Sequence, residues 1–430
     1  MVMFIFRKNN RSANNTKIIG IAGTRGKTIS ARMVAYMLQN MEFKVSLLDS
    51  DGYIFTDQSK EDFNVHLANS KDIKNFVAKS TKDNYDFLIF EVTSKNILNK
   101  VYDGTMFDLG VITNLYDDNI DLYTYFDRYV DTKFQFIKNI KNFGKLITFK
   151  NIEPIVYKYE NKIKQNVYYN TLDFENIINA SLKPDGLSFE YKDRLIDLKA
   201  IGIYNFENAL MSIALVENLI GDVNTQSLQN FSLPKGRMSL IEVNNIKLII
   251  DSSRHPDSIE SSIKHLYQTK LSSAKLITVG GSSEKYKKYR KKYSESLTKY
   301  ADLNILTIDD TYTEDVVNVN SEVINYARFL NGVTVDEFYS KENYEISDKN
   351  RIAKRIDMVI DRKDKPFLLF SYGNLYARLN AIEFALNYAK PGDIVYIYGK
   401  GNSNKMCLKN TMYNWNDFEV VEYVISNLKI

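Results

Sequence analysis

The chain has a single cysteine, Cys407, and three histidines among its 430 residues. One cysteine excludes a disulfide framework and any zinc site built from several cysteines, and three histidines exclude a histidine-rich metal site. No stretch approaches the roughly 20 apolar residues of a membrane-spanning helix. The short apolar run at the N-terminus lacks the cleavage region of a signal peptide. We therefore expect a cytoplasmic protein without a membrane span.

The charge balance is mild, with a formal net charge of +4 from 57 basic and 53 acidic residues. Such a balance does not by itself indicate a nucleic-acid partner. Six of the eight residues 285–292 are basic, which would suit a nucleic-acid-dependent ATPase. However, Tyr286, Tyr289, Tyr293 and Tyr300 recur there at helical spacing. We favour an amphipathic helix with a buried tyrosine face and a solvated basic face, and no nucleic-acid partner.

One glycine-rich turn, near the start of the chain, has the composition of a phosphate-binding loop. A β-branched run precedes it and a helical pattern follows it. Glycines let the backbone approach a phosphate, and the start of a helix presents free N–H groups and partial positive charge. Lys27 can reach terminal phosphate oxygens, and the Thr28 hydroxyl can ligate Mg²⁺. The predicted ATP-binding loop consists of Gly23, Thr24, Arg25, Gly26, Lys27 and Thr28.

The loop spacing departs from the general pattern, since Ile21 stands where that pattern has its first glycine. An ordinary glycine turn is the alternative, but Gly-Lys-Thr between a strand and a helix favours the phosphate loop. The apolar run 86–91 predicts a neighbouring strand that ends in Glu91. Ligands gather beyond the carboxyl ends of parallel strands, so we predict that Glu91 helps to hold Mg²⁺. A solvated glutamate at the strand end is the alternative.

Strands that alternate with helices predict an α/β fold with a mostly parallel sheet in the first part of the chain. Residues 145–200 show a different pattern, with short runs in which apolar and polar residues alternate. The runs 186–191 and 194–198 suggest hairpins on the edge of the sheet. A break at 233–238 marks a domain boundary, so we predict domains 1–238 and 239–430. The second part is predicted to be a Rossmann-like α/β domain with strands at 246–251, 276–279, 303–309, 366–370 and 394–398.

In their order along the chain, these motifs resemble those of the Mur ligase superfamily, most closely the MurE-type ligases. The phosphate loop resembles Gly-Thr-Asn-Gly-Lys-Thr, and Glu91-Val-Thr-Ser94 resembles Glu-Val-Ser-Ser. Residues 107–115, with Asp118 and Asp121, are similar to the strand and Thr-Asn-Leu-x-x-Asp-His-Leu-Asp motif. Other matches are Lys133 at the position of a carbamylated lysine, Asn205 and Asn208, Gly236-Arg237-Met238, Asp251 with residues 256–258, and Gly399-Lys400-Gly401.

The resemblance implies a central ATPase domain, a C-terminal α/β domain, and ATP-dependent amide formation between a small-molecule carboxylate and an amine through an acyl phosphate. It implies that Thr28, Glu91, Asn119 and a carbamylated Lys133 hold Mg²⁺. It also implies that Asn205, Asn208, Arg237 and Asp251 contact the nucleotide. The alternatives are a surface lysine at 133, polar helix-start groups at 205 and 208, and ordinary charges at 237 and 251.

Several departures from the pattern bear on the substrate. We expect the UDP-binding domain that precedes the phosphate loop in MurE-type ligases to be missing, as in the shorter folylpolyglutamate synthetases and poly-γ-glutamate synthases. Asp309-Asp310-Thr311-Tyr312 replaces the amino-acid-selecting Asp-Asn-Pro-Arg, and Arg378 lies in an altered motif. Two alternatives therefore stay open: a poly-γ-glutamate synthase-like ligase, and a catalytically reduced ATP-binding subunit that scaffolds a synthase complex with a partner.

Overall fold

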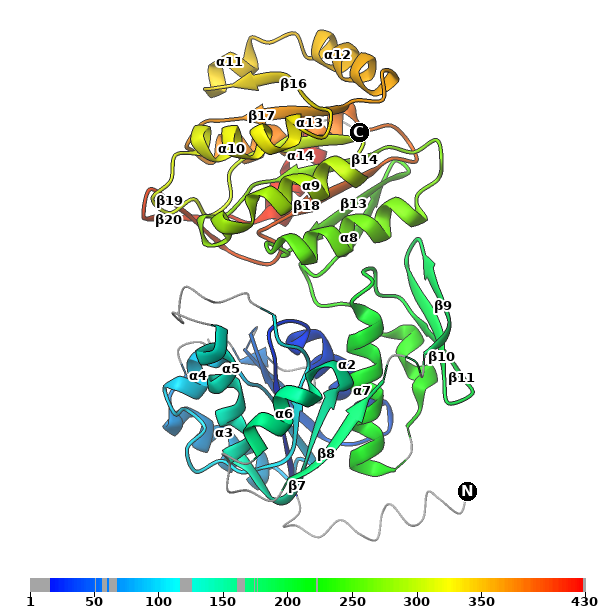
Figure 1. The fold of residues 1–430 in the computed structure, drawn as a ribbon, viewed down its shortest axis with the longest axis vertical. Coiled ribbons are helices and arrows are strands. Elements are labelled where there is room, and N and C mark those ends of the chain that lie inside the picture. Colours follow the sequence, from blue (N-terminus) through cyan, green and yellow to red (C-terminus); the bar gives the residue numbers. More distant parts are fainter. Residues whose placement is uncertain are drawn as a thin grey trace. The chain divides into compact units, whose positions relative to one another are not determined.

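The computed structural model describes residues 16–50, 52–55, 60–61, 68–116, 126–160, 167–173, 175, 177–221 and 223–427. The chain divides into two compact units (Figure 1). Unit 1 comprises Met1–Ser181, Leu187–Lys199 and Tyr204–Phe231, and unit 2 comprises Leu182–Gly186, Ala200–Ile203 and Ser232–Ile430. The assignment of residues 1–238 and 239–430 to a central and a C-terminal ligase domain stays a prediction.

Unit 1 is built on an eight-stranded sheet of order β4-β3-β2-β5-β1-β6-β7-β8. The six strands from β2 to β8 in this order are parallel, and β3 and β4 pair antiparallel at one edge. The mostly parallel sheet predicted from the sequence is thus confirmed. The strands are β1 (Lys17–Ala22), β2 (Val45–Asp49), β3 (Gly52–Phe55), β4 (Lys60–Glu61), β5 (Phe87–Glu91), β6 (Phe107–Ile112), β7 (Ile140–Phe149) and β8 (Val167–Leu172).

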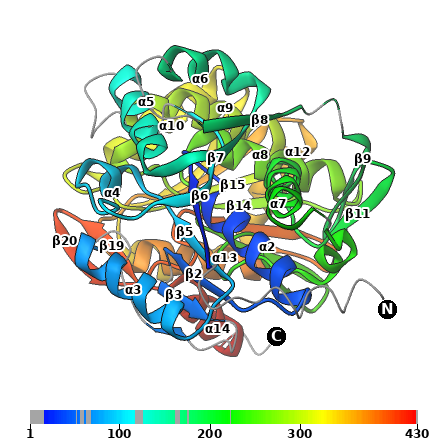
Figure 2. The ribbon, with the colours of Figure 1, turned by 90° about the horizontal axis from the view of Figure 1, so that it is seen from below.

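Helices cover the unit 1 sheet on both faces. The helix after the glycine turn, α2, packs beside α7, although the two lie far apart in the sequence (Figure 2). Against the other face, side chains of α3, α5 and α6 pack around Phe90 and Phe107 of the sheet. The helices are α2 (Lys27–Asn40), α3 (Ser70–Lys82), α4 (Ser94–Leu98), α5 (Phe126–Gln135), α6 (Glu153–Glu160) and α7 (Asn205–Ile220), with 3-10 turns η3 (Phe136–Asn139), η4 (Lys150–Ile152) and η6 (Thr225–Asn230).

The prediction of hairpins on the edge of this sheet was wrong in its placement. Strands β10 (Gly186–Tyr191) and β11 (Arg194–Leu198) do pair antiparallel. With β9 (Ile178–Lys183) they form a separate three-stranded sheet. The reason is that β8 already pairs with β7 at that edge, so β7 and β8 continue the parallel sheet into the region that looked different in the sequence.

Unit 2 contains a seven-stranded sheet of order β12-β13-β18-β14-β15-β17-β16. Only β12 runs antiparallel to its neighbour, at the edge beside β13. The strands are β12 (Ser239–Val243), β13 (Ile246–Asp251), β14 (Leu276–Gly280), β15 (Leu303–Leu306), β16 (Gly332–Phe338), β17 (Lys365–Phe370) and β18 (Ile394–Tyr398), and a separate hairpin is formed by β19 (Lys405–Leu408) and β20 (Thr411–Asn414).

The unit 2 sheet is also covered on both faces, which confirms the predicted Rossmann-like layering. Apolar side chains of α12, α13 and α14 pack with strand residues such as Ile250 and Ile277 in one large core, and α8, α9 and α10 pack side by side. The helices are η7 (Glu284–Tyr289), α8 (Pro256–Thr269), α9 (Arg290–Tyr300), α10 (Val316–Arg328), α11 (Lys341–Glu345), α12 (Lys349–Asp361), α13 (Tyr376–Tyr388) and α14 (Asp417–Asn427).

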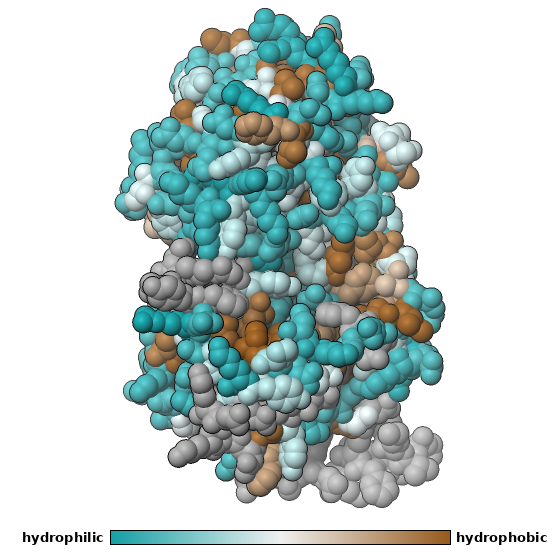
Figure 3. Space-filling model, in the orientation of Figure 1, coloured by the Kyte–Doolittle hydropathy of each residue, from teal (hydrophilic) through white to brown (hydrophobic). Residues whose placement is uncertain are grey.

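The surface is consistent with cores enclosed within each unit. On the face seen in the space-filling view, hydrophilic residues predominate over unit 2 and hydrophobic residues lie in scattered patches (Figure 3). Within the described ranges, no helix combines the length and the apolar character needed to cross a bilayer.

Candidate active site

The glycine turn between β1 and α2 has the backbone geometry that its sequence predicts. Gly26 is the N-cap residue of α2 and has a φ of 80°, a left-handed conformation that favours glycine. A Cβ atom on Gly26 would lie 2.1 Å from Oδ1 of Asn208, so any larger residue would collide with α7. The glycine therefore serves both the turn and the close packing of α7.

Lys27, Thr28 and Glu91 meet at this turn. The Thr28 hydroxyl donates to Oε2 of Glu91 over 2.8 Å. The Lys27 ammonium lies 3.9 Å from Oε1 of Glu91 and donates to the Thr24 carbonyl. The backbone amide of Ser50 also donates to Glu91 over 3.1 Å. Glu91 is buried, with 5% of its surface exposed, so the hypothesis of a solvated strand-end glutamate was wrong.

Hydroxyl and carboxylate oxygens are the hard ligands that Mg²⁺ prefers, and it binds through a few of them together with waters and phosphates. Thr28 and Glu91 therefore fit such an ion in their chemistry. Within the described part of the chain, no group of three or more His, Cys, Asp or Glu residues has the arrangement of a metal cage.

The first half of the turn is held by the end of β6 and by α5. Asn114 accepts the Arg25 amide through its side chain at 2.9 Å, and its backbone carbonyl accepts the Thr24 amide at 3.0 Å. The Thr24 hydroxyl is 2.6 Å from the Tyr129 hydroxyl, and the Arg25 guanidinium lies 4.6 Å from the centre of the Tyr116 ring. These contacts fix the loop in place, and the sequence reasoning did not assign Asn114, Tyr116 or Tyr129 to the site.

Lys133 lies on α5 and points at the same loop. Its side chain is buried, and its ammonium donates to the carbonyl of Gly23. The ammonium is also 5.4 Å from the centre of the Tyr129 ring. The hypothesis of a surface lysine was therefore wrong, and carbamylation of Lys133 stays a prediction. Asn119, Asp118 and Asp121 lie outside the described residues.

Asn205 and Asn208 begin α7 and are both buried. The Asn208 amide donates to Oδ1 of Asn205 over 2.8 Å, and Oδ1 of Asn208 accepts from Ser30 of α2 at 3.4 Å. The pair thus joins α7 to the helix that follows the loop. Between them, burial raises the pKa of Glu207, while the positive charge of Arg25 acts in the opposite direction.

Arg237 and Asp251 lie in unit 2. The Arg237 guanidinium donates to the Ser252 hydroxyl. Asp251 is buried; one carboxylate oxygen accepts the amides of Met238 and Ser252, and the other accepts the Tyr396 hydroxyl at 2.9 Å. Asp251 therefore braces the start and end of the β12–β13 hairpin, and its role in nucleotide binding stays a prediction.

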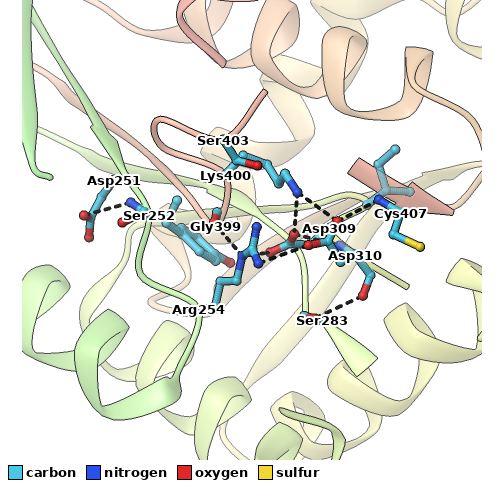
Figure 4. Close-up of polar contacts among 12 residues, drawn as sticks. Asp251, Ser252, Arg254, Ser283, Asp309, Asp310, Gly399, Lys400, Ser403 and Cys407 are labelled. Carbon is cyan, nitrogen blue, oxygen red and sulfur yellow. Dashed lines mark hydrogen bonds and ion pairs between the residues drawn. The ribbon is translucent and has the colours of Figure 1, made fainter. Parts of the chain in front are cut away.

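A closed cluster of ion pairs lies where the strands of unit 2 end (Figure 4). Arg254 donates to the Gly399 carbonyl at 2.7 Å and pairs with Asp310 at 3.0 Å. Lys400, with 1% of its side chain exposed, donates to Asp310 at 2.8 Å and lies 3.9 Å from Asp309. Burial alone would raise the pKa of Asp310, but the charges of Arg254 and Lys400 outweigh it and hold that pKa below its ordinary value.

Arg378, noted in the sequence for its altered motif, is an internal brace. It is fully buried and makes two hydrogen bonds of 2.8 Å to the carboxylate of Asp417. It also donates to the carbonyls of Ile308 and Tyr398. These four hydrogen bonds hold the end of β18 and the segment after β15 against α14.

The basic segment 285–292 is largely paired within unit 2. Arg290 is buried and bonds Glu314 and Glu322. Lys287 also pairs with Glu314, at 2.8 Å. The inward face of α9 carries the buried residues Tyr293, Leu297 and Tyr300, which confirms the predicted tyrosine face for this helix. Tyr286 and Tyr289 are only partly buried, and the burial of Arg290 departs from the predicted solvated basic face. The segment differs from the prediction at its start, where η7 is a 3-10 turn rather than an α-helix.

Comparisons with known proteins find relatives in both sequence and fold. Residues 21–216 match the family model described as the Mur ligase middle domain. A UDP-N-acetylmuramoyl-L-alanyl-D-glutamate–2,6-diaminopimelate ligase 1 of Clostridium acetobutylicum is 24% identical over 436 residues, which cover 97% of this chain and 79% of the relative.

Two solved structures share the fold at lower identity. A UDP-N-acetylmuramoyl-L-alanyl-D-glutamate–2,6-diaminopimelate ligase superposes with a TM-score of 0.61 at 17% identity, over 100% of this chain and 81% of the other. A bifunctional folylpolyglutamate synthase/dihydrofolate synthase with Mn, AMPPNP and L-glutamate bound superposes with a TM-score of 0.60 at 14% identity, over 100% and 93% of the two chains. The relatives are thus described as ligases and synthases, and the fold of this chain is similar to theirs. Residues 21–216 match the Mur ligase middle domain, and the chain is similar to Mur ligases over almost its whole length.

Proposed function

We propose that this chain joins a carboxylate to an amine through an acyl phosphate made from ATP, with the phosphate loop of unit 1 as the nucleotide site. The observation that carries the proposal is the meeting of Lys27, Thr28 and Glu91 at one strand-to-helix turn. An ammonium, a hydroxyl and a carboxylate in this arrangement suit a triphosphate with a divalent cation.

The reaction balances in two steps. A carboxylate oxygen of the acid attacks the γ-phosphorus, the bond to the β-phosphate oxygen breaks, and ADP leaves. The amine nitrogen then attacks the acyl carbon and loses a proton, and inorganic phosphate leaves with the oxygen that came from the acid. Two anions must approach in the first step, so positive charge at the loop is needed to stabilise the transition state.

The residue roles follow from this requirement. Lys27 would neutralise the charge that redistributes between the β- and γ-phosphates, and Thr28 and Glu91 would hold Mg²⁺. That ion, when bound, supplies charge neutralisation and orients the phosphates. Lys133, in carbamylated form, and Asn119 would support a second ion.

The nucleotide would also be held by residues outside the turn. We propose that Asn205 and Asn208 shape the site from α7, and that Arg237 and Asp251 contact the nucleotide from unit 2. A solved structure of similar fold is described with AMPPNP and Mn bound, which supports a nucleotide and a divalent cation here.

The substrate class is inferred from the relatives. The similar ligase of C. acetobutylicum is named for a diaminopimelate ligase reaction on a muramoyl dipeptide, and the synthase of similar fold is described with L-glutamate bound. We propose a peptide-like or amino-acid-like acid and an amino acid or other amine, with the amine differing from diaminopimelate because Asp309-Asp310-Thr311-Tyr312 has no arginine.

The test is isotope transfer with the purified full chain. Acids labelled with ¹⁸O in the carboxylate are incubated with ATP, Mg²⁺ and a panel of amines, and the phosphate released is analysed by mass spectrometry. We expect one ¹⁸O atom in each phosphate and one ADP for each amide formed. Nucleotide binding without any turnover across the panel would contradict the proposal and would favour a scaffolding subunit. Unlabelled phosphate alongside amide formation would contradict the acyl phosphate.

A further inference from the structure

Unit 2 contains a cavity whose lining includes none of the candidate site residues described above. It has a volume of about 570 Å³ and lies where β16 and β17 end and where α10 and α13 begin. Its volume falls within the range of about 300–1,000 Å³ typical of small-molecule sites. The carboxyl edge of a parallel sheet is also where open α/β folds bind ligands. Size and position together make the cavity a candidate binding site.

Open space borders Gly373 in the wall of the cavity. A Cβ atom on Gly373, in the connection from β17 to α13, would have a single neighbour within 4 Å, the Lys409 Cε at 3.8 Å. The floor beside it is rigid. The Tyr372 hydroxyl accepts from Asn380 at 2.7 Å and donates to the Tyr376 carbonyl at 3.2 Å, and Ser371 accepts from Asn320 at 3.0 Å.

Two tyrosine rings stand in the walls with much of their surface uncovered. Tyr339 at the end of β16 is 57% exposed, and Tyr376 at the start of α13 is 49% exposed. An aromatic ring left half-exposed in a cavity wall offers a flat apolar face to a ligand. The walls therefore favour a ligand with a planar or apolar body.

Lys409 is one of the two lysines that line the cavity. It lies in the turn between β19 and β20, is exposed, and has a φ of 48°. Among the residues that the structure describes, its ammonium has no hydrogen-bond or ion-pair partner. A second lysine, Lys341, lies 4.4 Å from the centre of the Tyr376 ring and pairs with Glu345 at 3.2 Å. An exposed ion pair of this kind contributes little to stability, so a ligand anion can replace Glu345 at Lys341.

The two carboxylates that line the cavity, Asp315 and Glu342, bond backbone amides. Asp315 caps α10 by accepting the amide of Val317 at 2.8 Å. The backbone amide of Glu342 itself and the Ser340 hydroxyl bond the Glu342 carboxyl and hold its pKa below its ordinary value. Both carboxylates thus bond backbone amides at the starts of helices. Lys409 has no such partner among the described residues and is the group that can pair with a ligand anion.

We propose that this cavity binds a small aryl carboxylate, with Lys409 and Lys341 at the carboxylate and the ring against Tyr339 and Tyr376. The site belongs to unit 2, whereas the phosphate loop belongs to unit 1, and the proposal does not depend on the proposed ligase reaction. Binding is expected with no nucleotide present.

The test uses benzoate as the probe and the full chain without nucleotide, with binding followed by saturation-transfer NMR. We expect saturable binding that Lys409→Asn weakens at least 5-fold. Asparagine tolerates the left-handed backbone at this position. The matched control is Lys363→Asn, since Lys363 is also exposed and has a φ of 65°; it should leave binding unchanged. Tyr376→Ala should weaken binding without unfolding unit 2.

Three results would overturn the proposal. They are the absence of saturable benzoate binding, equal loss in the two lysine variants, and equal affinity for inorganic phosphate and benzoate. The last result would mean that the tyrosine walls take no part. Competition of benzoate by benzylamine at similar concentrations would likewise contradict a carboxylate site.

Discussion

The carboxyl edges of the two sheets arrange their charged side chains in opposite ways. In unit 1, a single carboxylate, Glu91, is shared by the Thr28 hydroxyl, the Lys27 ammonium and a backbone amide. In unit 2, two cations and two carboxylates neutralise one another in a closed cluster beneath Gly399. The first arrangement suits a ligand that brings its own charge. In the second, the charges are balanced within the cluster, although Oδ2 of Asp309 lies 3.6 Å from Arg254 and has no hydrogen-bond partner among the described residues.

This difference predicts which substitutions affect activity and which affect stability. A polar group held for a ligand contributes to turnover more than to folding, whereas a buried ion pair becomes costly when one partner is removed. Four substitutions test this difference between the two units, and the one with the largest expected effect comes first.

Lys27→Met should lower the rate of ADP release at least 100-fold, because one positive charge at the transferring phosphoryl group is lost. The Lys27 side chain is 15% exposed and lies 3.9 Å from the buried Glu91, so some loss of stability is expected. The melting temperature should nevertheless stay well above the temperature of the assay, so that the loss of activity is not caused by unfolding. Lys138→Met, at an exposed lysine of the same unit, is the control and should retain full activity. A fully active Lys27→Met protein would show that the loop does not serve the reaction.

Asp310→Asn should destabilise unit 2 by about 3 kcal/mol, toward the lower end for a broken buried pair. The loss is limited because Asp309 still lies 3.9 Å from Lys400. Urea unfolding can be followed by fluorescence of Trp415, the one tryptophan of the chain, which is buried in unit 2 and bonds Asp417 at 2.8 Å. The exposed Asp361→Asn is the control. Equal unfolding midpoints for the two variants would contradict a stabilising role of the cluster.

Glu91→Gln should raise the Mg²⁺ concentration needed for half-maximal turnover about 10-fold or more, as removal of a carboxylate near a metal does. Glutamine retains an oxygen that can accept from Thr28, so the fold of the turn should persist. A Mg²⁺ titration of ADP release measures the effect. An unchanged titration curve would place the metal away from Glu91.

His265→Gln should remove a small pH dependence of unit 2 stability. The imidazole is buried between the Gly202 amide and the Lys183 carbonyl, and burial lowers its pKa. The unfolded chain therefore takes up this proton first as the pH falls through about 6.5, so stability is complete above that pH and declines below it. Trp415 fluorescence in thermal unfolding between pH 7.5 and 5.5 measures the slope, which should be shallower in the variant.

Much of the architecture could be predicted from local sequence signals. The strand, the glycines and the Lys27-Thr28 pair lie within one short stretch, where backbone preference and charge point to one structure. Glu91 could be placed beside the loop because parallel strands end at a common edge. Strands at Ile246–Asp251 and Ile394–Tyr398 were predicted with their observed bounds, since each is a compact apolar run.

Features that depend on distant partners could not be predicted. Asn114, Tyr116 and Tyr129 reach the loop only because β6 and α5 are placed beside it by the sheet order. The cluster of Arg254, Asp310 and Lys400 likewise depends on strands that are neighbours in the sheet and not in the sequence.

Short elements were missed for a different reason. Strands β19 and β20 have four residues each, which is too short for a periodic pattern. The one available signal was the Lys409-Asn410 turn, in which both residues have positive φ, a conformation typical of tight hairpins and favourable for asparagine. Strand β15 ends at Leu306, before the aspartates that were assigned to it.

The single thiol of the chain offers a way to observe the ion cluster opening. Cys407 has 5% of its surface exposed, its amide donates to Asp310 at 2.8 Å, and burial raises the pKa of its thiol. A buried, protonated thiol reacts with a disulfide reagent only when the surrounding structure opens. The labelling rate of the Cys407 sulfur therefore measures how often the structure around the ion cluster opens, and no engineered probe is needed.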